Sequence, residues 1–279
     1  MQVSLDLPAL DIELSNLCQT SCLMCPRDAI KKRGLGVMKP ETFTRIVKEC
    51  KKFRIQNVAF CGLGEPLLNK HIFNYIKLLK QEINGIKISM VTNGVLLTAE
   101  IVQKLIIAGI DSISISLQAL DPVLYSTLMP GLDYNQVIKN IHEAIAIAPP
   151  RLRIAVNFTS HKMNQHELET FKNYWRRYAQ IRLNNMHTRG GYVNDERLME
   201  PVTKNIITTR CKIFEGINFI AYDGRILSCC HDAQGDNVMG DVHINTFDEI
   251  RKNKLQIIRE FKWFPICSGC TDILRNTLF

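Results

Sequence analysis

The sequence contains no apolar run long enough to span a membrane, because charged residues interrupt each run well before the roughly 18 residues that a span requires. The segment Met1–Leu7 has neither a basic start nor an apolar stretch before a small-residue cleavage site, so we expect no secretory signal. Basic residues are not interleaved with aromatic ones, which argues against nucleic-acid binding. These features predict a cytoplasmic protein that binds neither membranes nor nucleic acid.

Cysteine, by contrast, is abundant, with 10 among 279 residues. Stable disulfides are rare in the cytosol, so metal binding is the leading explanation for so many thiols. The length allows one full core and a small appended module. The formal net charge of +8 is spread over short clusters, which favours a solvated surface over a patch that binds an anionic partner.

Short β-branched runs alternate with segments of helical period between residues 8 and 190. The predicted strands are Ala9–Leu14, Ile55–Cys61, Ile86–Thr92, Ser112–Gln118, Arg153–Thr159 and Ile181–His187. The predicted helices are Pro40–Lys52, Lys70–Gln81, Thr98–Ala108, Tyr134–Ala148 and Gln165–Tyr178. Thr98 and Asn164 are the predicted helix caps. This alternation predicts an α/β fold with a parallel sheet and right-handed crossovers.

One face of the predicted strands is polar. In the fourth strand Ile113 and Ile115 alternate with Ser114 and Ser116, and a closed, packed barrel would have Val, Ile and Leu on both faces. The pattern therefore predicts a partial (β/α)6 TIM-like open barrel whose polar interior holds a ligand. After about residue 205 the strand–helix rhythm gives way to Gly-, Asp- and Cys-rich sequence, so we expect two domains, 1–205 and 206–279.

Three cysteines, Cys18, Cys22 and Cys25, follow the first predicted strand. Three thiolates at this spacing can bind three irons of a 4Fe-4S cluster and leave the fourth iron open to a small molecule. A structural zinc site is the alternative, but it needs a fourth protein ligand. The C-x3-C-x2-C loop resembles the signature of the radical S-adenosylmethionine (SAM) superfamily over residues 10–190. The resemblance implies that SAM chelates the open iron and that an electron, from a reductant such as flavodoxin or ferredoxin, cleaves it to a 5′-deoxyadenosyl radical.

Further residues resemble the SAM contacts of this superfamily. The sequence Gly62-Leu63-Gly64-Glu65-Pro66 is similar to its Gly-Gly-Glu-Pro motif, which implies that Glu65 binds the methionine amino group. Met24 stands where the family commonly has an aromatic residue, and the resemblance implies an apolar contact to the adenine. It also implies SAM contacts for polar residues at later strand ends, which are Asn93, Ser116, Gln118 and Asn157. Taken alone, these side chains also suit ordinary turns and satisfied polar strand positions.

A second group of cysteines lies in the C-terminal part. Asp223-Gly224 predicts a hairpin turn between strands at 216–222 and 225–228, which brings Cys211 and Cys229 together. The spacing resembles the SPASM module in its shorter "twitch" form. That resemblance implies one auxiliary 4Fe-4S cluster, ligated by Cys211, Cys229, Cys267 and Cys270. A zinc ribbon is the alternative. Cys230 adjoins Cys229, and only the family spacing favours Cys229 as the ligand.

Four further residues are candidate catalytic groups. Arg189 and His187 follow the sixth predicted strand, where Arg189 can clamp a substrate oxygen and His187 can take a proton. Structural pairing is the alternative for both. Either Cys61 or Cys230 can face the cavity as a hydrogen-atom donor, whereas Cys50 on a helix is predicted to be a buried small apolar residue.

The Arg-Gly-Gly sequence at 189–191 resembles small twitch dehydrogenases of this superfamily that act on an aminocyclitol. It implies oxidation, or alternatively epimerisation, of a small polyol, aminocyclitol or sugar. Modification of a ribosomally synthesised peptide is a second possibility, with recognition supplied by a separate partner because the catalytic loop begins at Cys18. A zinc-binding nucleic-acid module is the non-enzyme alternative, and the strand–helix repeats argue against it.

Overall fold

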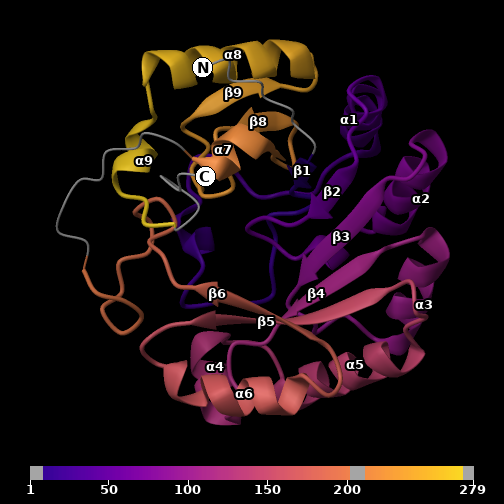
Figure 1. Ribbon diagram of the computed structural model, residues 1–279, viewed down its shortest axis with the longest axis vertical. Helices are drawn as coiled ribbons and strands as arrows, with labels where there is room; N and C mark the ends of the chain where they lie inside the picture. Colours follow the sequence, from indigo (N-terminus) through magenta and orange to yellow (C-terminus); the bar gives the residue numbers. More distant parts are fainter. Residues whose placement is uncertain (1–8, 202–210, 273–279) are drawn as a thin grey trace.

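The computed structural model describes residues 9–201 and 211–272, and all strands in these ranges form one nine-stranded sheet (Figure 1). The strand order is β6-β5-β4-β3-β2-β1-β7-β8-β9. The first six strands are parallel and are Ala9–Ile12 (β1), Asn57–Phe60 (β2), Lys87–Thr92 (β3), Ser112–Ser116 (β4), Arg153–Ser160 (β5) and Gln180–Asn185 (β6). Because β6 and β9 are free edges, the sheet does not close, which confirms the predicted α/β partial barrel.

Helices cover the outer side of the parallel strands (Figure 1). They are Pro40–Lys52 (α1), Ile72–Glu82 (α2), Ala99–Ala108 (α3), Pro122–Leu128 (α4), Tyr134–Ile147 (α5) and Leu168–Trp175 (α6). The apolar strand residues beneath them, such as Leu10, Ile88 and Ile113, are completely buried. This layer is the hydrophobic core, and it leaves the opposite face of the strands for polar groups. No helix among the described residues is long and apolar enough to cross a membrane.

The helix ends agree with the sequence signals in most places. Pro40 is the first residue of α1, and the Thr98 hydroxyl accepts a hydrogen bond from the Ile101 amide at the start of α3. Asn164 stands at the N-cap position of the short helix Gln165–Glu167, as predicted, but its side chain makes no capping hydrogen bond. Its Oδ1, the atom that would accept from the helix amides, accepts from the His161 amide at 2.9 Å, and its side-chain amide donates to the carbonyls of Gln118 and Thr159 at 2.9 Å each.

The C-terminal residues extend the same sheet. They form Lys212–Gly216 (α7), Ile217–Ile220 (β7), Arg225–Leu227 (β8), Val238–Asp241 (β9), Phe247–Glu260 (α8) and Pro265–Ser268 (α9). The predicted hairpin is confirmed as the antiparallel pair β7 and β8. Strand β7 also pairs in parallel with β1, from Ala9 opposite Ile217 to Ile12 opposite Ile220. The barrel and the C-terminal module therefore share one sheet, and the expected boundary between residues 205 and 206 lies outside the described residues.

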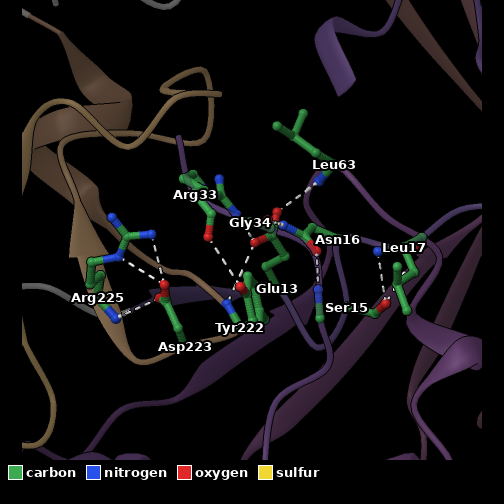
Figure 2. A network of polar contacts seen from close by, with 11 residues as sticks. Glu13, Ser15, Asn16, Leu17, Arg33, Gly34, Leu63, Tyr222, Asp223 and Arg225 are labelled. Carbon is green, nitrogen blue, oxygen red and sulfur yellow. Dashed lines mark hydrogen bonds and ion pairs between the residues drawn. The ribbon is translucent and has the colours of Figure 1, made fainter. Parts of the chain in front are cut away.

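A buried polar network joins β1, the loop before α1 and the β7–β8 turn (Figure 2). Arg33 donates to the Glu13 carboxylate, and both side chains are completely buried. The Leu63 amide donates to Glu13 Oε1 at 3.2 Å, and the Tyr222 hydroxyl donates to the Arg33 carbonyl at 3.1 Å. The network fixes the loop that carries the first three cysteines against the C-terminal hairpin.

Candidate active site

The first three cysteines lie in the loop between β1 and α1, and each is partly buried. The Cys25 amide donates to the Cys22 carbonyl at 2.9 Å, so the loop turns tightly between them. Burial, with the neighbouring thiols of Cys25 and Cys18, raises the pKa of Cys22 to about 12. Three thiols on one tight turn suit an iron site, whose assembly releases their protons.

Glu65 lies close to this loop and is 1% exposed. Its carboxylate accepts hydrogen bonds from the Thr92 hydroxyl and the Asn93 amide, both at 2.8 Å, and from the Leu67 amide at 3.1 Å. Burial raises its pKa to about 7, and the three hydrogen bonds oppose that rise. A buried carboxylate with no cationic partner among the described side chains suits a ligand that brings its own ammonium group.

Two glycines let the Glu65 loop approach the cysteine loop. A Cβ atom at Gly64 would overlap the Ser15 carbonyl and lie 2.6 Å from the Leu17 carbonyl, and one at Gly62 would lie 2.8 Å from Glu13 Cγ. The Glu65 amide accordingly donates to the Leu17 carbonyl at 2.8 Å. The Gly-x-Gly-Glu sequence is therefore required for packing as well as for any ligand contact.

The other predicted SAM contacts lie at the carboxyl ends of β3 to β5. Asn93 donates to Gln19 Oε1 at 3.1 Å and lies 3.7 Å from Cys18 Sγ. Ser116 at the end of β4 pairs in register with Asn157 on β5. Asn157 Oδ1 is buried without a hydrogen-bond partner among the described residues, so it is open to a ligand that fills the barrel.

Two of the predicted SAM contacts have protein partners of their own. Gln118 is engaged by the protein, because its side-chain oxygen accepts from the Thr159 amide at 2.8 Å. Met24 is 9% exposed and packs in the main apolar core.

Four C-terminal cysteines line a single pocket, and they are Cys211, Cys229, Cys267 and Cys270. Its walls are mainly apolar, with contributions from Ile213, Phe214, Phe264 and Ile266. The Ser228 hydroxyl in the wall is buried and has no hydrogen-bond partner among the described residues. Four thiols, apolar walls and a spare donor fit a fully ligated iron–sulfur cluster. Cys230 packs instead against Phe219, Ala221 and Leu227, outside this lining.

A polar cluster, formed by His187, Arg189, His231 and Asp272, adjoins this pocket. Asp272 Oδ2 lies 3.0 Å from His231 Nε2 and 3.5 Å from His187 Nε2. Arg189 Nη1 lies 3.5 Å from His231 Nδ1, and its charge also opposes the rise that burial causes in the pKa of Cys25. The polar cluster therefore adjoins the second group of cysteines and interacts electrostatically with the first.

The ring of His187 is neutral at pH 7. Burial, reinforced by the charges of His231 and Arg189, lowers its pKa to about 4, although Asp272 opposes this. The sequence had indicated His187 and Arg189 but neither partner. His231 is 3% exposed although it lies in a polar stretch, and Asp272 comes two residues after Cys270. In the sequence, their positions next to clustered cysteines were the one feature that could have indicated His231 and Asp272 as site residues.

Cys61 and Cys230, the two other candidate thiols, are distant in sequence and each is partly buried. The Cys61 thiol is hydrogen-bonded to Asp11 and interacts electrostatically with Cys230. Burial raises the pKa of Asp11 to about 6. The prediction that Cys50 is a buried apolar residue is confirmed, since it is completely buried on α1.

The open α/β barrel with clustered cysteines at the carboxyl ends of its strands defines an iron–sulfur protein of the partial-barrel type. The family model "Radical SAM superfamily" matches residues 12–174, and the chain belongs to this superfamily. A second model, the SPASM "iron-sulfur cluster-binding domain", matches residues 211–271. These two domains bring SAM and two 4Fe-4S clusters as cofactors, as the sequence predicted.

Curated relatives share the barrel sequence. A probable GTP 3′,8-cyclase of Methanocaldococcus jannaschii is 33% identical over 172 residues, which is 61% of this chain and 56% of that protein. A GTP 3′,8-cyclase of Clostridium botulinum is 30% identical over 172 residues, which is 61% of this chain and 53% of that protein. The chain thus matches little more than half the length of these relatives.

Solved structures resemble the whole fold. BtrN in complex with AdoMet and 2-DOIA has a TM-score of 0.67 at 16% identity and covers 95% of this chain and 93% of BtrN. Streptococcus suis SuiB bound to the precursor peptide SuiA has a TM-score of 0.73 at 16% identity, covering 94% of this chain and 70% of SuiB. At this identity the likeness shows the fold alone.

Proposed function

We propose that this chain is a radical SAM oxidoreductase that dehydrogenates a secondary alcohol of a small polyol, aminocyclitol or sugar. In this proposal Cys18, Cys22 and Cys25 hold the SAM-binding cluster, and Glu65 binds the SAM amino group. The auxiliary cluster is held by Cys211, Cys229, Cys267 and Cys270. When bound, these cofactors supply a 5′-deoxyadenosyl radical that removes a carbon-bound hydrogen atom and an acceptor for one electron.

The observation that best supports alcohol oxidation is the polar cluster formed by His187, Arg189, His231 and Asp272. Oxidation of an alcohol to a ketone removes one hydrogen atom, one proton and one electron, so a proton acceptor must lie between the hydrogen-abstracting and electron-accepting sites. Arg189 approaches His231 and interacts electrostatically with Cys25, so its guanidinium can hold the substrate oxygen. In this proposal His187 accepts the hydroxyl proton at Nδ1 once the substrate displaces the Arg189 backbone amide, which donates to that nitrogen at 3.2 Å. Asp272, whose Oδ2 is 3.5 Å from Nε2, orients the ring.

Epimerisation differs in its last step, because the substrate radical then takes back a hydrogen atom and releases no electron. The partly buried thiols of Cys61 and Cys230, which interact electrostatically, support this variant. A thiol S–H bond donates one hydrogen atom and leaves a sulfur radical, which takes one electron from the reduced auxiliary cluster and one proton from solvent to become a thiol again. Product analysis in deuterated water separates the two reactions, because only epimerisation places solvent deuterium on product carbon.

Two other substrate classes have support. The relatives named GTP 3′,8-cyclase favour a purine nucleotide. The likeness to SuiB with its precursor peptide, and an open groove beside Cys25 lined by Leu23, Tyr192 and Asn194, favour a peptide. GTP and peptides therefore belong in the same assay as the polyols and aminocyclitols.

The deciding experiment follows deuterium from substrate into 5′-deoxyadenosine. Anaerobically reconstituted protein is incubated with dithionite, SAM and each carbon-deuterated candidate. We expect deuterium in 5′-deoxyadenosine and a ketone product in equal amounts with one alcohol. A product that retains all its deuterium, with unlabelled 5′-deoxyadenosine, would contradict hydrogen abstraction. Labelled 5′-deoxyadenosine with GTP alone would replace the alcohol with a nucleotide substrate.

A further inference from the structure

Lys254 on α8 is a lysine whose side chain is completely buried, in contrast to Lys252 on the same helix, which is 67% exposed. Its ammonium donates to the carbonyls of Phe214 and Ile217, at 2.8 and 2.7 Å. It also lies 4.9 Å from the centre of the Phe214 ring. Two carbonyls and one aromatic face occupy the three N–H donors, which is an environment suited to the charged form.

No carboxylate among the described residues lies within ion-pair distance of Lys254, so its charge has no ordinary partner. An unpaired buried ammonium is costly. Burial lowers the pKa of Lys254 to about 7, and negative charge on Cys229 and Cys211 opposes this. Phe214, whose carbonyl and ring hold the ammonium, lines the pocket that contains these cysteines.

We infer that Lys254 is the buried counter-ion of the auxiliary cluster and that its positive charge raises the cluster's reduction potential. A cluster ligated by four thiolates gains one further negative charge on reduction, so a nearby cation stabilises the reduced form more than the oxidised form. A higher potential makes the cluster a better acceptor of the electron that alcohol oxidation releases. The inference rests on the proposed assignment of the four C-terminal cysteines, but not on the identity of the substrate.

The test is a redox titration of the auxiliary cluster alone. The full-length chain carrying C18A, C22A and C25A is reconstituted anaerobically, and the cluster signal is followed by electron paramagnetic resonance against potential. In the Lys254→Met variant we expect the ratio of reduced to oxidised cluster at the original midpoint to fall about tenfold. For a one-electron couple this is a shift of about −59 mV.

Matched variants separate charge from structure. Lys254→Arg keeps the charge and should keep the potential, and Lys252→Met removes an exposed charge from the same helix and should leave the potential unchanged. Lys254→Gln is a second neutral variant in case the Met protein does not retain its irons. An unchanged midpoint in either neutral variant with a full iron content would overturn the inference. Absence of any iron in the parent triple variant would instead refute the assignment of the four cysteines.

Discussion

Glu13, the residue after β1, and Arg33 in the cysteine-bearing loop form an ion pair in which neither side chain is exposed to solvent. Nε and Nη1 of Arg33 are buried and have no other partner among the described residues. Removing one member of such a pair strands the other charge in a low-dielectric interior. We therefore expect Glu13→Gln to lower the free energy of unfolding by about 3–5 kcal/mol.

The measurement is urea denaturation of the reconstituted protein under anaerobic conditions. Lys32→Ala is the matched control, because it breaks the neighbouring ion pair with Asp236, in which the side chains are 67% and 44% exposed. An exposed pair contributes at most about 1 kcal/mol. Equal losses in the two variants would contradict a structural role for the Glu13–Arg33 pair.

Gly64 is expected to tolerate no side chain. A Cβ atom there would overlap the Ser15 carbonyl, which is backbone and cannot rotate away. Gly64→Ala should separate the Glu65 loop from the cysteine loop and abolish SAM binding, as measured by calorimetry. Gly216→Ala is the control, since its Cβ would meet no atom within 4 Å. Normal SAM affinity in the Gly64→Ala protein would show that the two loops do not have to touch.

The raised pKa of Glu65 leads us to expect that the affinity for SAM depends on pH. Its pKa is raised to about 7, so the carboxyl is largely protonated below pH 7 and loses its attraction for an ammonium group. The affinity should therefore rise with pH between 6 and 8, by up to about tenfold per unit below the pKa. Glu65→Gln should bind SAM weakly, and its affinity should not show the rise with pH that ionisation of Glu65 causes. Any pH dependence that remains in this variant comes from titration of SAM itself. Parallel pH profiles for the two proteins would exclude Glu65 as the titrating group.

The sequence predicted what depends on local spacing and missed what depends on distant pairing. Cys18, Cys22 and Cys25 are neighbours in the chain, so their chemistry could be inferred before the fold was known. His231 and Asp272 are 41 residues apart and become partners only in the folded chain. Polar residues such as these have no periodic pattern to indicate burial.

The contacts that the sequence missed follow the same logic. Asn164 stands at a helix start, but the His161 amide takes the side-chain oxygen that would cap it. The parallel pairing of β1 with β7 joins segments separated by about two hundred residues, and it leaves no trace in local composition. The predicted domain boundary between residues 205 and 206 stays a prediction, because it lies outside the described residues.

The two groups of cysteines should behave as separate iron sites. Cys22→Ala should lose roughly four irons per chain together with SAM cleavage, whereas Cys267→Ala should lose roughly four irons but retain some cleavage. Cys50→Ala, which alters a buried cysteine on α1 outside both groups, should keep all the iron. Iron and sulfide analysis checks the first result, and 5′-deoxyadenosine formation checks the second. Identical phenotypes for Cys22→Ala and Cys267→Ala would show that the two sites are not independent.

Arg189 should control the coupling between SAM cleavage and product formation. Its guanidinium lies 3.5 Å from His231 Nδ1 and acts on Cys25, so it can orient a substrate oxygen between the two iron sites. Misplacing the reacting bond by about 1 Å costs on the order of 100-fold in rate. Arg189→Gln should therefore slow product formation by roughly this factor, while 5′-deoxyadenosine continues to form without product.

The measurement is the molar ratio of 5′-deoxyadenosine to product, which should be near one in the original protein and should rise steeply in Arg189→Gln. Arg197→Gln is the control, because Arg197 is exposed and pairs with Asp195 in the same loop. Arg189→Lys keeps the charge but not the planar fork of donors, so an intermediate ratio is expected if geometry as well as charge matters. A ratio near one in Arg189→Gln, with slow turnover, would instead mean that Arg189 acts before hydrogen abstraction, in binding SAM or in assembling the first cluster beside Cys25.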